Sequence, residues 1–135
     1  MRALIVALAL FVAACASPLV TAQRSVSAAA TLGAAAGELV ISVNAERDQA
    51  IAGQVLLDHD VAKAEKARAE WHAQRDKAMQ ALRTYNAIVV AAGATAMLAG
   101  SKQISLGAIL ISLSDAYTAL KSAMDAYGVK LPGGI

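Results

Sequence analysis

The chain has 135 residues, enough for one ordinary domain and too few for two. Hydrophobic residues make up 58% of it, but 34 residues are alanine, which adds little volume to a core. With 4% aromatic residues and proline only at Pro18 and Pro132, the composition favours an all-α protein of closely packed helices. The net charge of +2 is too small to indicate nucleic acid, and the lone Cys15 excludes an internal disulfide framework.

The first segment has the layout of a secretory signal peptide. Met1 and Arg2 precede residues 3–14, which carry no polar side chain, and small residues follow. As a helix these twelve residues would span about 18 Å, short of a hydrocarbon core of about 30 Å. We therefore predict a signal peptide over residues 1–14. An uncleaved anchor stays open as an alternative, because residues 3–22 contain no charge.

The end of this segment, Val12-Ala13-Ala14-Cys15, resembles the bacterial lipobox. The resemblance implies a thioether-linked diacylglycerol on Cys15, which would become the first residue of the mature chain. By the sorting rule of that family, a residue other than Asp after the cysteine, here Ala16, implies outer-membrane delivery in a Gram-negative cell. Alternatively, Cys15 is an ordinary residue of the signal, and cleavage after Ala16 or Ala22 releases a soluble periplasmic protein.

The mature chain divides into a lipidated tether over residues 15–27, a helical domain over 28–128 and a flexible tail over 129–135. The tripeptide Asp58-His59-Asp60 is a candidate break within the domain, and either aspartate can cap a new helix. A single helix over residues 28–92 is the alternative. Gly128 stands where a glycine commonly ends a helix.

Residues 38–83 carry interleaved charges, eight acidic and seven basic. Three oppositely charged pairs have helical spacing and indicate a solvated helix face: Lys66 with Glu70, His72 with Asp76, and Glu65 with Arg68.

Two apolar runs follow a strict heptad spacing of alternating threes and fours. The later run comprises Leu106, Leu110, Leu113, Tyr117, Leu120, Met124 and Tyr127. The earlier run comprises Ala78, Leu82, Tyr85, Val89, Ala92 and Ala96. Because the connection near residues 100–103 is short, the two runs should face each other in antiparallel helices. The predicted fold is an antiparallel helical hairpin or a small bundle of two to four helices.

The sequence carries no motif of a known catalytic or cofactor site. His59 between two aspartates, and His72 with Asp76, are the nearest approach to a metal site, but neither set has a third ligand in register. We therefore expect no enzyme activity, no metal and no cofactor. Trp71 has two interpretations, a core aromatic residue or an exposed anchor for a partner.

In layout, the chain looks like the small alanine-rich helical lipoproteins of Gram-negative bacteria and of their phages and prophages. That likeness implies a non-enzymatic lipoprotein facing the periplasm, with the outer membrane favoured, whose helices contact another protein or copies of itself. A phage origin would imply a role in lysis or exclusion. We expect neither nucleic acid nor a small-molecule substrate. The alternatives are a holin-like membrane protein with spans over residues 3–22 and 87–113, and the soluble periplasmic protein.

Overall fold

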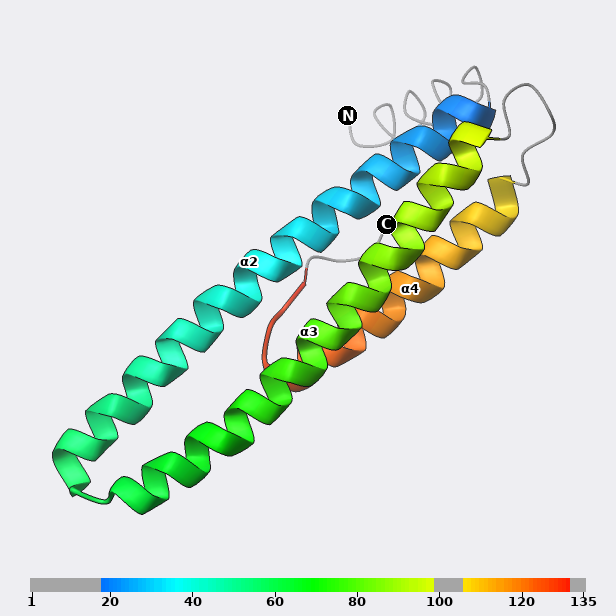
Figure 1. Ribbon diagram of the computed structural model, residues 1–135. Coiled ribbons are helices and arrows are strands. Elements are labelled where there is room, and N and C mark those ends of the chain that lie inside the picture. The colour runs from blue at the N-terminus through cyan, green and yellow to red at the C-terminus, as the bar shows by residue number, and fades with distance from the viewer. Residues whose placement is uncertain (1–17, 99–105, 132–135) are drawn as a thin grey trace, which may run out of the picture.

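The computed structural model describes residues 18–98 and 106–131, and these residues form helices and short connections without a strand. The helices are α2 (Pro18–Asp58), α3 (Val61–Leu98) and α4 (Leu106–Tyr127). α3 runs back along α2, and α4 reverses direction again beside α3 (Figure 1). The all-α prediction is confirmed. The predicted signal peptide, the lipidation of Cys15 and the connection at 100–103 lie outside the described residues.

The break between α2 and α3 falls at the predicted tripeptide. His59 adopts a left-handed conformation with a φ of 53°, and its N–H donates to the carbonyl of Val55 at 3.0 Å. Asp60 then caps α3, because its Oδ1 accepts a hydrogen bond from the Lys63 N–H at 3.0 Å. The predicted break is confirmed, and the alternative of one continuous helix is wrong.

Small residues let α2 approach α3 closely. Ala22, Ala29 and Ala36 recur every seven residues on the buried face of α2. The buried hydroxyl of Tyr85 donates to the Ala29 carbonyl at 2.8 Å, so the ring reaches the backbone of the neighbouring helix. Such an approach requires that no bulky side chain stand between the two helices. This face of α2 was not predicted, because alanine carries little hydrophobic signal.

The core joins the three helices into one cluster of buried residues. Its members include most of the residues of the two heptad runs: Ala78, Leu82, Tyr85, Val89, Ala92, Ala96, Leu113, Tyr117, Leu120, Met124 and Tyr127. Leu106 is partly buried against them.

The prediction that Leu110 is buried is wrong, because that side chain is 37% exposed and Ile109 is buried instead. A straight α-helix makes five full turns in 18 residues, so Ile109 lies directly in line with Tyr127. A strict heptad repeat drifts around such a helix by about 20° per repeat. Over the length of α4 this drift shifts the buried position from residue 110 to residue 109.

Both predicted flexible ends differ from the structure. Of the predicted tether over residues 15–27, residues 18–27 belong to α2, and Ala22 is fully buried. Of the predicted tail over residues 129–135, Val129 and Leu131 are buried against the core, and residues 132–135 lie outside the described part. Apolar side chains at these positions hold both segments on the bundle.

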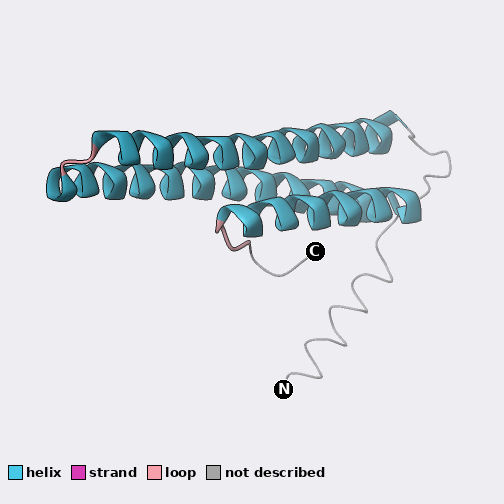
Figure 2. Cartoon of the chain, turned by 90° about the horizontal axis from the view of Figure 1, so that it is seen from below, coloured by secondary structure: helices cyan, strands magenta, loops and turns pink. Residues whose placement is uncertain are grey.

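α4 is much shorter than its neighbours and covers only part of the hairpin (Figure 2). Its 22 residues extend about 33 Å, whereas the 38 residues of α3 extend about 57 Å. Past the level at which α4 ends, α2 and α3 continue without a third helix among the described residues. We call this two-helix part, residues 47–58 and 61–74, the arm. The predicted span over residues 87–113 is also wrong, because its two ends belong to antiparallel helices.

Two stretches, Leu19–Asp58 and Val61–Leu98, are long and apolar enough to cross a membrane. Core helices of soluble proteins satisfy the same criterion, so length and composition give only weak support for membrane association.

Candidate functional site

An aromatic stack marks the level at which α4 ends. Trp71 of α3 lies against Tyr127, with ring centroids 4.1 Å apart and ring planes 18° from parallel. The guanidinium carbon of Arg47, on α2, lies 3.2 Å from the Trp71 ring centroid and 5.9 Å from that of Tyr127. All three helices therefore contribute one side chain to a cation–π contact and an aromatic stack. We call these three residues, together with Asn44, Asp48 and His72, the junction.

A glycine turn places Tyr127 at the junction. Gly128 has a φ of +88°, a conformation that other residues rarely adopt. Its N–H donates to the Asp125 carbonyl at 3.0 Å, and the Val129 N–H donates to the Met124 carbonyl at 2.8 Å. These two bonds are the hydrogen-bond pattern of a left-handed helix C-cap, which confirms Gly128 as the end of the helix. A Cβ on Gly128 would lie 3.0 Å from Nη2 of Arg47, so glycine also leaves room for the guanidinium group.

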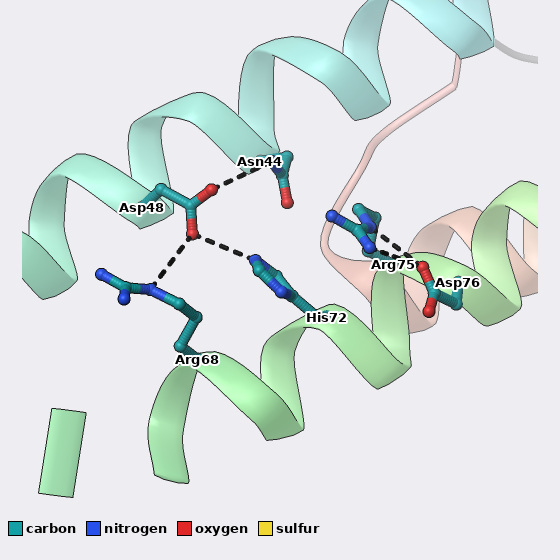
Figure 3. Close-up of polar contacts among 6 residues, drawn as sticks. All are labelled: Asn44, Asp48, Arg68, His72, Arg75 and Asp76. Carbon is teal, nitrogen blue, oxygen red and sulfur yellow. Dashed lines mark hydrogen bonds and ion pairs between the residues drawn. The ribbon is translucent and has the colours of Figure 1, made fainter. Parts of the chain in front are cut away.

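Asp48 is the polar centre of the junction (Figure 3). Its Oδ2 accepts a hydrogen bond from Nδ2 of Asn44 at 3.2 Å. Its Oδ1 lies 3.3 Å from Nε2 of His72 and 4.0 Å from Nε of Arg68, both on α3. The carboxylate therefore joins α2 to α3 beside the stack.

The predicted pairing of His72 with Asp76 is wrong. Asp76 instead accepts two hydrogen bonds from its neighbour Arg75, at 2.8 and 3.0 Å, while His72 faces α2 (Figure 3). The spacing within α3 predicted that His72 pairs with an aspartate. The aspartate is Asp48, which lies on α2. In the described part of the chain, no three His, Cys, Asp or Glu side chains gather in a way that would hold a metal ion.

Three buried polar atoms of the junction have no hydrogen-bond partner among the described residues: Oδ1 of Asn44, Nε1 of Trp71 and the hydroxyl of Tyr127. Burial raises the pKa of the Tyr127 hydroxyl, an effect that the positive charge of Arg47 opposes. An unsatisfied buried donor or acceptor costs about 1–3 kcal/mol. Such a concentration of unsatisfied groups is unusual in a helical core and marks the junction as a candidate binding site.

An open groove of about 340 Å³ runs from the junction along the arm. The groove is lined by Trp71, by the charged Arg47 and Glu70, and by the apolar Ile51 and Ala67. The groove therefore offers side chains of both charges and an apolar lining. These are the components of a surface that binds a peptide or a helix.

The sequence pointed to some residues of this site but did not show which residues contact one another. Trp71 was recognised as either a core residue or a partner anchor; it is 5% exposed, and it also lines the groove. Arg47 and Asp48 had no distinguishing signal in the sequence. Cys15, the predicted lipidation site, lies outside the described residues.

Comparison with models of known protein families, with curated proteins and with solved structures finds no match to this chain.

Proposed function

We propose that the protein is a non-enzymatic envelope lipoprotein that binds a protein partner through its two-helix arm. The anchor is a lipid on Cys15, and the chain faces the periplasm, with the outer membrane as the favoured location. The observation that carries the proposal is the arm: α2 and α3 continue past the end of α4 and keep a lined groove without a third helix to fill it. The likeness to phage and prophage lipoproteins adds lysis or exclusion as the context.

The arm has the features of a contact surface. Its tip carries the exposed leucines Leu56 and Leu57, the second of which is 81% exposed. Trp71 lines the groove nearer the junction. Tryptophan and arginine are the side chains most enriched at binding hot spots, and here Arg47 lies on Trp71.

The length of α2 supports an arm that is distant from the proposed anchor. α2 begins at Pro18, three positions after Cys15, and runs 41 residues to Asp58. At 1.5 Å per residue, the tip lies about 60 Å from the end that joins the proposed anchor. The tip is therefore the part of α2 most distant from the proposed anchor, and it is the part offered to a periplasmic partner.

The lipid is tested by expressing the full chain in a Gram-negative host with radiolabelled palmitate. We expect incorporation into the wild-type chain and none into Cys15→Ser, together with an intact mass that fits acylation at residue 15. A mature chain that starts at Ser17 or Gln23 without added mass would contradict the anchor and favour the soluble alternative.

The arm is tested by placing a photoreactive amino acid in the full chain. Ala50 lines the groove, whereas Ala69 is exposed on the same arm and lines none of the described grooves. We expect one defined adduct from position 50, with a partner or with a second copy, and its loss when Glu70→Ala is added. Equal adducts from positions 50 and 69, or no adduct from position 50, would contradict the proposal.

A further inference from the structure

Charge is distributed unevenly along the bundle. The residues nearest the start of α2, namely 19–37, 84–98 and 106–114, contain one charged side chain, Arg24. We call these three stretches the apolar half. The remaining charges of the described helices lie beyond Gly37, before Thr84 and after Ser114. Lys102 belongs to the connection that lies outside the described residues.

The three stretches lie beside one another in the structure. Tyr85 bonds to the Ala29 carbonyl, and a Cβ built on Gly93 would lie 3.3 Å from Val26. Ala92 and Ile109 line one groove between α3 and α4. The charges therefore end at a similar level on all three helices. On α2 the apolar half extends about 28 Å, close to the thickness of about 30 Å of a hydrocarbon core.

The outer surface of the apolar half carries large apolar side chains on more than one helix. On α3, Leu98 is 87% and Val90 71% exposed, and Met97 is exposed beside them. On α4, Ile111 is exposed as well. A second copy of the chain would cover one face of the bundle, whereas lipid can cover the exposed faces of α3 and α4 together. The distribution therefore favours lipid over self-association as the material that covers this surface.

The exposed threonines of the apolar half need no water to satisfy their hydroxyl donors. Thr31 donates to the Ser27 carbonyl at 3.0 Å, and Thr95 donates to the Ala91 carbonyl at 2.9 Å. In hydrocarbon, polar groups must be satisfied within the protein, and a helix carbonyl is the nearest acceptor. Arg24 lies about 9 Å from the start of α2, within reach of lipid headgroups for a long side chain.

We propose that the apolar half is embedded among the acyl chains of a bilayer, with the arm outside. Cys15, the proposed lipid site, precedes α2 at this same end of the bundle. The inference goes beyond the lipid anchor, because the helices themselves contact acyl chains whether or not Cys15 is modified. It also differs from the spans predicted from the sequence, because it involves all three helices of the bundle.

The test uses the full chain in phosphatidylcholine–phosphatidylglycerol vesicles with and without brominated acyl chains, which quench tryptophan at short range. Leu98→Trp and Val90→Trp report on the apolar half, and Leu57→Trp, at an equally exposed leucine, is the matched control. The signal of the native Trp71 is subtracted with the wild-type chain. We expect residues 98 and 90 to lose most of their added fluorescence in brominated vesicles and residue 57 to lose none.

Each other result would overturn the proposal in a recognisable way. Quenching at residue 98 alone would show that only the end of the bundle touches lipid. Similar quenching at all three positions would show a bundle lying flat on the surface. A blue-shifted but unquenched residue 90 would show a surface covered by a second copy. Intact mass from the same samples reports the state of Cys15, so failure of the lipid anchor is separated from failure of this inference.

Discussion

The two ends of the α2–α3 hairpin are built from different side chains and packed in different ways. In the apolar half, alanines and glycines bring α2 against α3, and α4 completes a three-helix core. In the arm, the same two helices carry interleaved charges and have no third helix beside them. The stack of Arg47, Trp71 and Tyr127 marks the level at which the third helix ends.

The difference shows what a third helix contributes. Where α4 is present, large side chains such as Leu113 and Leu120 are almost completely buried. Between Trp71 and the tip of the arm, each helix has one buried residue, Ile51 on α2 and Ala64 on α3. Because stability follows buried apolar area, the arm should contribute little to folding and be free to bind a partner.

The largest expected effect comes from removing a buried leucine next to α4. Leu113→Ala should lower the free energy of unfolding by about 2–5 kcal/mol, because it leaves a cavity in the three-helix core. Leu110→Ala makes the same chemical change at a site 37% exposed and should cost much less. Denaturant unfolding of the full chain in mild detergent measures both. Equal losses would contradict the assigned face of α4.

A matched pair of glycines compares the two regions directly. A Cβ on Gly33 would overlap Oδ1 of Asn86 and lie 3.2 Å from a ring carbon of Tyr85. Gly33→Ala should therefore destabilise the protein, since overpacking costs about 1–3 kcal/mol and exceeds the gain in helix propensity. In the arm, Gly53 has no atom within 4 Å of its added Cβ. Gly53→Ala should raise the free energy of unfolding by about 0.5–1 kcal/mol. Thermal unfolding of both variants tests the comparison, and a destabilised Gly53→Ala chain would refute it.

The boundary between the regions is tested at Tyr127, whose buried hydroxyl lacks a partner among the described residues. Tyr127→Phe should raise the free energy of unfolding by about 1 kcal/mol, because it removes an unsatisfied group. Burial raises the pKa of Tyr127, so the stability tied to its neutral form is complete below the unfolded pKa of about 10. That stability is lost as the pH rises through the folded pKa. The variant should therefore lose less stability than wild type between neutral and strongly alkaline pH in denaturant titrations. A lower stability of the variant at neutral pH would reveal a bound partner for the hydroxyl.

The smallest effects are expected at the tip of the arm. His59→Gly should raise the free energy of unfolding by about 0.5–1 kcal/mol, because glycine adopts the left-handed conformation without steric cost. Asp60→Ala should change it in the opposite direction by about 1 kcal/mol, because the cap of α3 is lost. Thermal unfolding of the two variants measures both shifts. Shifts of the same sign would contradict the assigned geometry of the turn.

Local signals in the sequence predicted the helices and their ends better than their contacts. The cap at Asp60 and the glycine at Gly128 act within a few residues, so they are readable without a structure. The buried alanines of α2 repeat every seven residues, but so many other alanines occur in this helix that the repeat does not stand out in the sequence. Leu110 was misplaced because a strict heptad was applied to a straight helix.

The junction could not be read from the sequence. Trp71 meets Tyr127 only because α4 has its particular length and register against α3. Asp48 of α2 pairs with His72 of α3, which lies 24 residues later in the chain. Contacts of this kind depend on the packing of whole helices, which no local pattern records.

Hydrogen exchange along α2 tests the difference between the two regions most directly, because this one helix belongs to both. For the full chain in mild detergent, peptide-level mass spectrometry should show slow exchange over residues 22–40 and markedly faster exchange over residues 47–57. The change should fall near the level of Arg47, where α4 ends. Uniform protection from residue 22 to residue 57, or slower exchange in the arm, would contradict the account.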